Sequence, residues 1–115
     1  MLLGLLLLAA IQDAPPPEVI TNPEWSARPS GAQIAMVAPP AMFRDGLSGR
    51  TVMQCVVTVE GLLDDCEIVE EDPPGRGFGQ ATLRLAPSFR LSPQTRDGVP
   101  VGGARVRIPV TWNMN

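Results

Sequence analysis

Residues 51–70 constrain the fold more than any other part of the chain. Apolar side chains alternate with polar ones on both sides of Glu60 and Gly61, which is typical of two half-buried β-strands joined by a tight turn. The apolar positions are Met53, Cys55, Val57 and Val59 on the first strand and Leu62, Cys66 and Ile68 on the second. The sequence therefore predicts an antiparallel hairpin.

The turn of this hairpin decides where the two cysteines lie. A two-residue loop, or a four-residue loop over residues 59–62, places Cys55 directly opposite Cys66. Opposed residues have Cα atoms roughly 4.5 to 5.5 Å apart, within reach of a disulfide. The alternative is a type I turn with Gly61 as a bulged residue, which shifts the register by one and sets Cys66 against Gln54. We predict the Cys55–Cys66 disulfide, worth about 2 to 3 kcal/mol, because paired cysteines in a small exported chain favour one.

The N-terminus predicts export. Residues 1–11 read MLLGLLLLAAI and carry no charged side chain, which is the length and composition of the hydrophobic region of a signal peptide. The run stops at Gln12 and Asp13, short of the roughly 20 apolar residues that a stable transmembrane helix needs. We expect cleavage after Ala10; the alternative is an apolar strand or short anchor that stays attached.

A lead-in without helical or strand periodicity follows over residues 12–30. It is rich in proline, which predicts an extended backbone. Its one tryptophan, Trp25, is expected to pack on the domain, with contact to a partner as the alternative.

Two short helices are predicted from local patterns. Ser30 and Gln33 have the spacing of a capping box, so a helix over Gly31–Val37 should open there and end before the prolines that follow, where a second turn starts at Pro40. Residues 78–86 place apolar or small side chains at the spacing of an amphipathic helix that is stopped by proline, namely Phe78, Ala81, Thr82 and Leu85.

A last strand over Arg105–Trp112 completes the sheet. A helix that crosses back over the sheet makes this strand antiparallel to the first, beside which it should lie. The strand order becomes 2-1-3 and puts the third strand at an edge, where Pro109 is tolerated because it has no N–H to donate. We therefore predict an α+β fold of two layers: a three-stranded antiparallel sheet with short helices packed on one face.

The composition argues against an enzyme, a cofactor site or a metal site. The chain has no histidine, and its nine basic residues are all arginine, so the usual activating bases for a serine or threonine nucleophile are lacking. The run GRGFG at 75–79 lacks the lysine and spacing of a phosphate loop. A net charge of -3 suggests neither nucleic acid nor an anionic membrane as a partner.

Charges are unevenly placed along the chain. Seven acids crowd into residues 60–72, whereas the later part is rich in arginine. We interpret this as a solvated strand face opposite a basic one; the alternative is a charge-complementary binding surface.

The chain from about Ser48 to Trp112 resembles the C-terminal domain of TonB-type energy transducers. The matching text is SGRTVMQCVVTVEGLLDDC followed by GFGQATLRLAPSFRLSPQTRDGVPVGGARVRIPVTW. The paired cysteines resemble a subgroup in which the hairpin is disulfide-linked. The resemblance implies a non-enzymatic periplasmic domain that binds peptide segments of outer-membrane receptors by strand addition at a sheet edge, as part of TonB-dependent transport. Here that edge would consist of Arg105, Val106, Arg107, Ile108, Pro109, Val110 and Thr111.

The whole chain is thus predicted to divide into four parts: a leader (1–11), an extended lead-in (12–30), a short helical segment (31–47) and the TonB-like domain (48–115). The short apolar run and lead-in lead us to expect a free-standing form of the domain, in the periplasm, touching the inner membrane only if the leader is retained. The alternative function is a structural or assembly domain of the envelope, without energy transduction, whose edge is capped by its own lead-in or by a second copy in a homodimer.

Overall fold

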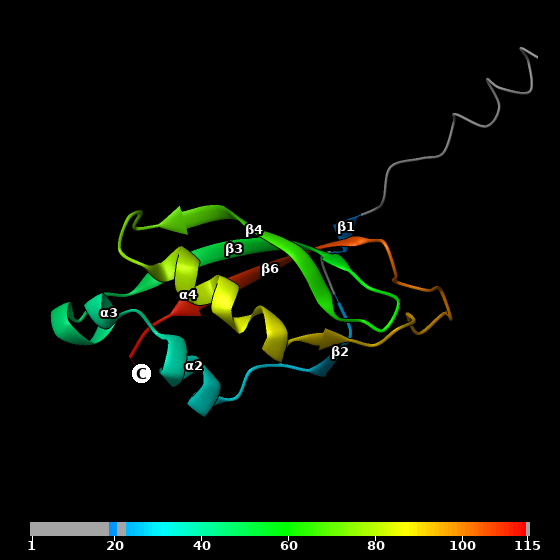
Figure 1. Ribbon diagram of the computed structural model, residues 1–115, viewed down its shortest axis with the longest axis horizontal. Helices are drawn as coiled ribbons and strands as arrows, with labels where there is room; N and C mark the ends of the chain where they lie inside the picture. Colours follow the sequence, from blue (N-terminus) through cyan, green and yellow to red (C-terminus); the bar gives the residue numbers. More distant parts are fainter. Residues whose placement is uncertain (1–18, 21–22, 115) are drawn as a thin grey trace, which may run out of the picture.

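The computed structural model describes residues 19–20 and 23–114, so the predicted leader over 1–11 lies outside the described residues. Within these described residues, four short helical segments and six strands follow one another. Figure 1 shows their arrangement. In order they are β1 (Val19–Ile20), β2 (Trp25–Ala27), α2 (Gly31–Val37), α3 (Pro40–Asp45), β3 (Gly49–Val57), β4 (Leu63–Asp72), α4 (Phe78–Leu85), the 3-10 helix η1 (Ala86–Ser88), β5 (Arg90–Leu91) and β6 (Arg105–Trp112).

The main sheet has four strands in the order β1-β6-β3-β4. Its last three strands are antiparallel and confirm the predicted 2-1-3 order. The description as a purely antiparallel, three-stranded sheet is wrong, because β1 pairs in parallel with Arg105 and Val106 at the start of β6. A second, two-stranded sheet joins β2 to β5. Both corrections involve strands of two or three residues, which are too short to show periodicity in a sequence.

The β3–β4 hairpin has the alternative turn, in which Gly61 is the bulged residue. Gly61 has a φ of 90° and donates its N–H to the carbonyl of Thr58, and Val57 therefore lies opposite Leu63. The two-residue and four-residue loops that place Cys55 opposite Cys66 are both wrong. The shifted register lasts only to Asp64, since a bulge at Asp65, with a φ of 47°, adds one residue to β4.

This bulge restores the pairing of the cysteines. Gln54 lies opposite Glu67 beyond the bulge, and Cys55 and Cys66 come within 4.1 Å between their Cα atoms and form the predicted disulfide. The bulge thus reconciles the turn that Gly61 favours with the register that the disulfide needs. Val59, which was expected on the buried face, lies in the turn and is 75% exposed.

The helices begin where their local sequences predict. At the start of α2, the Ser30 hydroxyl accepts the N–H of Gln33 at 3.1 Å and the Gln33 amide oxygen accepts the N–H of Ser30 at 2.8 Å, which confirms the capping box. Helix α3 begins at Pro40 as expected. Helix α4 ends at Leu85, one residue earlier than predicted, and η1 continues it past Pro87.

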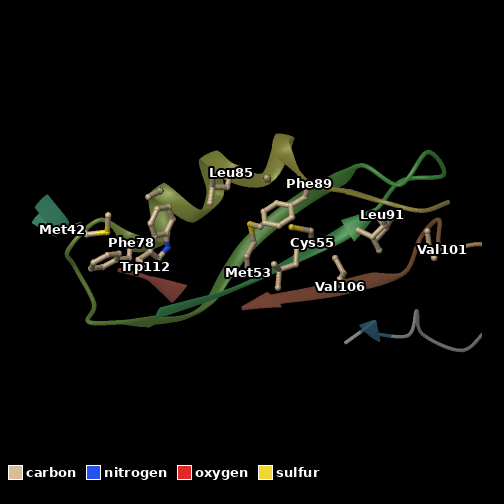
Figure 2. Close-up of a cluster of buried hydrophobic side chains, with 14 residues drawn as sticks. Met42, Met53, Cys55, Phe78, Leu85, Phe89, Leu91, Val101, Val106 and Trp112 are labelled. Atoms are coloured by element: carbon tan, nitrogen blue, oxygen red, sulfur yellow. The ribbon is translucent and has the colours of Figure 1, made fainter. Parts of the chain in front are cut away.

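The core lies between α4 and one face of the sheet (Figures 1 and 2). The four predicted positions of α4 are all buried, and Trp112 from the end of β6 lies beside the first of them, Phe78, with ring centroids 6.4 Å apart. Position 49 requires glycine, because a Cβ there would lie only 2.7 Å from the ring of Phe78. The largest buried side chains of the core are Trp112, Phe78, Met53, Leu85, Leu91, Val57 and Val106.

Thr82 joins three elements through one buried hydroxyl. Its Oγ1 donates to the carbonyl of Phe78 at 2.8 Å, accepts the Trp112 Nε1–H at 3.0 Å and lies 2.7 Å from the hydroxyl of Thr51. Both threonines are fully buried, so no water can replace a lost partner.

The substitution Thr82→Val is expected to lower the free energy of unfolding by about 1 to 3 kcal/mol. It keeps the volume of the side chain but leaves the indole N–H of Trp112 and the Thr51 hydroxyl without their partner. Urea denaturation measures the change. Thr111→Val, on the exposed side of β6, is the matched control and should change stability by less than about 0.5 kcal/mol. Equal effects of the two substitutions would contradict the network.

Candidate functional site

The outer edge of β6 presents unpaired backbone groups. The N–H of Val57 donates to the carbonyl of Ala104 at 2.8 Å, which fixes the parity of the ladder between β3 and β6. Backbone groups alternate in direction along an antiparallel strand, so the even-numbered residues of β6 bond to β3. Arg107, Pro109 and Thr111 therefore direct their backbone groups away from β3. Pro109 lies on this outward side, where its missing N–H costs the sheet nothing.

The predicted edge is partly covered. Of the seven residues expected to form it, Arg105 and Val106 are paired with Val19 and Ile20 of β1. The expectation that the whole of β6 is an edge strand is therefore wrong at its first two residues. Within the described part of the chain, no strand pairs with Arg107–Thr111 on the outer side, and this segment is called the open edge below.

A groove runs beside the open edge. It has a volume of about 570 Å³ and combines residues from the lead-in, α2, α4 and β6 with Phe89, which follows η1. Its apolar lining is Trp25, Ile34, Leu85, Phe89, Ile108 and Val110, and its remaining residues are Pro23, Arg28, Pro29, Arg107, Pro109 and Thr111. A strand added to the open edge would have an apolar surface beside it.

The lead-in contributes four residues to the lining of this groove, namely Pro23, Trp25, Arg28 and Pro29. The indole ring of Trp25 lies 5.0 Å from the ring of Phe89, as centroid distance, which confirms that this residue packs on the domain. Trp25 pairs with Leu91 and Ala27 with Arg90 in the small sheet. The carbonyl of Glu24 accepts the N–H of Ser92 at 2.9 Å.

An ion pair fixes the start of this segment. Glu24 Oε1 accepts a hydrogen bond from Arg96 Nε at 2.6 Å. This hydrogen bond, and then the charge of the carboxylate, raise the pKa of Arg96 above its ordinary value. The contact is exposed and therefore contributes little energy to the placement of the lead-in.

The groove is positively charged. Among the residues that the structure describes, Arg28 and Arg107 line it, and no aspartate or glutamate does. Arg107 Nε donates to the amide oxygen of Gln54 at 2.7 Å, a neutral partner that leaves the positive charge in place.

The opposite edge of the sheet is acidic. Of the seven acids in 60–72, Glu71 is half-buried, and its carboxylate accepts the N–H of Gly79 at 2.9 Å in the first turn of α4, where a negative charge is favoured. The other acids are exposed, namely Glu60, Asp64, Asp65, Glu67, Glu70 and Asp72. Bulges and exposed carboxylates both discourage strand addition, so the two edges of the sheet differ in kind.

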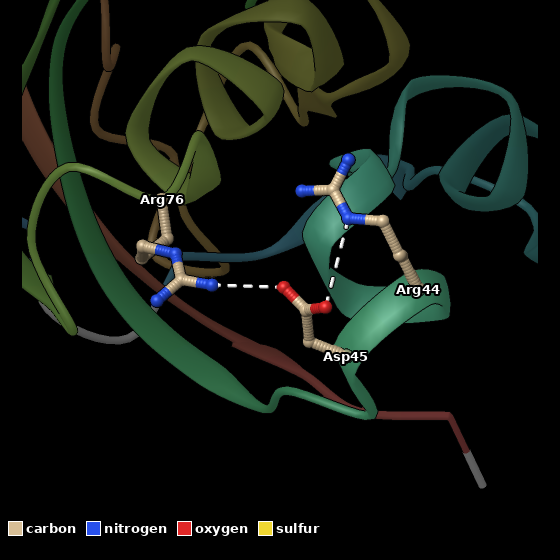
Figure 3. Close-up of polar contacts among 3 residues, drawn as sticks. All are labelled: Arg44, Asp45 and Arg76. Carbon is tan, nitrogen blue, oxygen red and sulfur yellow. Dashed lines mark hydrogen bonds and ion pairs between the residues drawn. The ribbon is translucent and has the colours of Figure 1, made fainter.

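Arg76, one of the arginines after the acidic run, does not line the groove. It donates to Asp45 Oδ2 at 2.9 Å, and Arg44 lies 3.6 Å from the same carboxylate (Figure 3). This exposed cluster ties α3 to the loop before α4 and contributes little energy.

Residues 19–20 and 23–114 contain no group of three or more potential metal ligands. The same residues form no helix of the length and apolar character that crossing a membrane requires.

Most of the groove could not be found in the sequence. The predicted site named β6 alone, and Trp25 was assigned to packing, with a partner contact only as the alternative. Tertiary packing brings Trp25 together with Ile34, Leu85 and Phe89, which come from separate parts of the chain. No local spacing in the sequence encodes this arrangement. The one available signal was the position of a tryptophan in an otherwise polar and proline-rich lead-in.

Fold and groove together define a small α+β domain with an edge strand that is open over five residues. A family model described as "Gram-negative bacterial TonB protein C-terminal" matches residues 39–114, which is more than half of the chain. The chain belongs to this family, and the resemblance noted in the sequence is confirmed. The match begins at Pro39 and therefore includes α3. Members of this family are transducer or binding domains of the Gram-negative envelope, without enzymatic activity, and bind outer-membrane receptors.

A second comparison gives a relative of similar size. An uncharacterized protein of Caulobacter vibrioides is 29% identical over 59 residues, which cover 51% of this chain and 59% of that protein. The chain thus matches less than two thirds of the length of this relative.

Proposed function

We propose that this domain is a periplasmic module that binds an extended peptide segment of an outer-membrane receptor along the open edge of β6. The observation that carries the proposal is the open edge itself, beside a preformed apolar groove. Strand addition uses main-chain hydrogen bonds for affinity and pockets for alternate side chains for specificity. Both elements are present here.

The hydrogen-bonding capacity of the open edge limits the ligand. On the outward side, Arg107 and Thr111 each offer an N–H group and a carbonyl. Pro109, which lies between them, offers a carbonyl only. The five residues of the open edge, Arg107–Thr111, accommodate a peptide of about five paired residues, at about 3.3 Å per residue. The same restriction predicts modest affinity, since each backbone hydrogen bond contributes only about 0.5 to 1.5 kcal/mol.

The alternative is a structural envelope domain whose edge is closed by its own chain. The pairing of Val19 and Ile20 with the start of β6 favours it, because it shows that the lead-in reaches this edge. The pairing stops at Val106, however, and the next part of the lead-in, β2, pairs with β5 instead. A peptide-binding role therefore fits the open edge, Arg107–Thr111, better than closure by the lead-in does.

A titration followed by NMR separates the two functions. Peptides from the N-terminal plug segments of outer-membrane receptors of the same cell are added to the isotopically labelled chain. Binding at the edge is expected to shift the amide resonances of Arg107–Thr111. Absence of shifts at millimolar peptide, with these amides already protected from hydrogen exchange, would show that the edge is occupied and overturn the proposal.

The substitution Arg107→Pro is expected to weaken peptide binding about tenfold. It removes an outward N–H and adds a ring at the edge, while the ladder with β3 keeps all its bonds. Arg107→Ala is the matched control, because it loses the same side chain but keeps the N–H. Thr111→Pro with its control Thr111→Ala repeats the test at the second donor. If the proline and alanine variants bind equally well and unfold at the same urea concentration, the peptide does not pair with this edge.

A further inference from the structure

We propose that the face of the main sheet opposite α4 is a self-association surface, on which a second copy of this chain docks through two complementary strips of charge. This face is called the helix-free face below. The inference goes beyond peptide binding, because it uses the flat face of the sheet and leaves the open edge uncovered in both copies.

The strand register determines which residues form the helix-free face. Paired residues of neighbouring strands point to the same side of a sheet, and successive residues point to opposite sides. Met53 pairs with Ile108, and both belong to the core under α4. The next residue, Gln54, pairs with Glu67 on β4 and with Arg107 on β6, so these three side chains lie on the helix-free face.

The helices of the described residues lie on the other side of the sheet. Met42 of α3 and Leu85 of α4 belong to the core, and Val37 of α2 packs against it. Figure 2 shows α4 over the core side of the sheet. Glu67 and Arg107 on the helix-free face are exposed to solvent.

The charges on the helix-free face are separated into two strips. The basic strip, on β6, carries Arg105 and Arg107 and no acid. The acidic strip, on β4, carries Asp64, Glu67, Glu70 and Asp72 and no basic residue. Strand β3 lies between the strips, so their backbones are two strand spacings apart, or about 10 Å.

The two strips do not neutralise each other within one copy. Arg107 Nε donates to the amide oxygen of Gln54 at 2.7 Å, and this partner is uncharged. Arg50, at the start of β3, lies 3.9 Å from Glu70 in an ion pair between two exposed side chains. Among the described residues, no arginine lies within ion-pair distance of Glu67. Arg107 and Glu67 are therefore the charges best placed to pair with another molecule.

A two-fold axis parallel to the strands makes this face complementary to itself. Such an axis, placed over β3, stacks β6 of each copy on β4 of the other, and Arg107 then faces the partner's Glu67 at two equivalent places. Aligned sheets stack about 10 Å apart, a gap that arginine and glutamate side chains can fill. An axis perpendicular to the strands would stack β6 on β6 and set arginine against arginine. The charges thus select the first arrangement.

The separation of the strips also argues for a second copy as the occupant. A surface of uniform charge, such as a nucleic acid or an anionic membrane, would be attracted by one strip and repelled by the other. A second copy carries both signs at the required spacing. Val52 and Val56 lie on β3 between the strips and provide the apolar centre of the contact.

The size of the helix-free face predicts a weak dimer. Eight residues of β3 pair with β6, so three strands give a surface of about 14 by 26 Å, or about 400 Å² in each copy. Stable complexes bury about 800 Å² in each partner. We therefore expect a transient dimer that forms at high protein concentration and depends on salt.

Sedimentation velocity with the full chain tests for this dimer. At low salt the sedimentation coefficient is expected to rise from the monomer value as the protein concentration increases to about 1 mM, as for other small and transient interfaces. At about 1 M salt the Debye length falls to about 3 Å, and the chain should sediment as a monomer.

Charge reversal identifies the surface. Arg107→Glu and Glu67→Arg should each weaken the dimer at least about tenfold, because each variant sets like charges against one another at two places. An equimolar mixture of the two variants should dimerise about as well as the native chain, and so should the double variant, since opposite charges then meet again. A variant that has simply misfolded would not recover on mixing.

Two control variants make the same changes in net charge elsewhere. Arg84→Glu on α4 and Glu60→Arg in the hairpin turn alter exposed side chains outside the helix-free face. They should change the dissociation constant by less than about twofold at physiological salt, where distant exposed charges are screened.

Three results would overturn the inference. The first is a native chain that remains monomeric at about 1 mM and low salt, where even a small transient interface should be populated. The second is a dimer that persists in both single variants, because another surface then holds it. The third is a failure of both the mixture and the double variant to restore the dimer.

Discussion

The substitution Phe78→Ala is expected to lower the free energy of unfolding by about 3 to 5 kcal/mol, among the largest effects of any single change in this chain. The Phe78 side chain is fully buried at the first position of α4 and fills the space between Trp112 and the backbone of Gly49. Gly49 has no side chain that could move into the cavity. Since small domains are stable by about 5 to 15 kcal/mol, the variant is left with little reserve.

Urea denaturation, followed by the fluorescence of the two tryptophans, measures this loss. Phe43→Ala is the matched control: it removes the same atoms from a ring that is 53% exposed on α3, and should change stability by less than about 0.5 kcal/mol. Similar midpoints for the two variants would mean that the α4–β6 contact does not hold the core together.

Local patterns in the sequence predicted the elements around this core. The capping box at Ser30, the buried positions of α4 and the bounds of β6 are each encoded by neighbouring residues, and the structure confirms them. The strand order followed from a crossing helix and the position of Pro109. These inferences succeed because the apolar positions given by the periodicity of each element are the positions that face the core.

Contacts of the lead-in could not be predicted in this way. Strands β1 and β2 have two and three residues, and both depend on partners about 65 or more residues away in the sequence. Pairing of this kind is determined by tertiary context, so the partial closure of β6 and the contribution of the lead-in to the groove were both missed. Sequence reasoning identified the strand that carries the candidate site but not the groove beside it.

The hairpin shows a conflict between two local preferences. Gly61 favours a left-handed turn that alone would set Cys66 against Gln54, on the wrong face of the sheet. The disulfide and the half-buried Ile68 require the other register. The structure satisfies both with the bulge at Asp65, which a sequence pattern of strict alternation does not show.

Reduction of the Cys55–Cys66 disulfide is therefore expected to lower the free energy of unfolding by about 3 kcal/mol. The bond closes a loop with a sequence separation of 11, and in the chain-entropy model such a loop restricts the unfolded state by about that amount. The folded hairpin should keep its register without the bond, since Ile68 packs against the core in this register alone. The loss is then expected as a lower urea midpoint rather than as a rearranged sheet.

The double substitution Cys55→Ala with Cys66→Ala controls for other effects of the reductant. Unfolding of this variant should be insensitive to dithiothreitol and should match that of the reduced native chain to within about 1 kcal/mol, because the alanines keep most of the small volume of the cysteines. Amide exchange along β4 reports the register in each case. An unchanged midpoint for the native chain, with two thiols titrated after reduction, would show that the bulge and the core hold the hairpin without help from the disulfide.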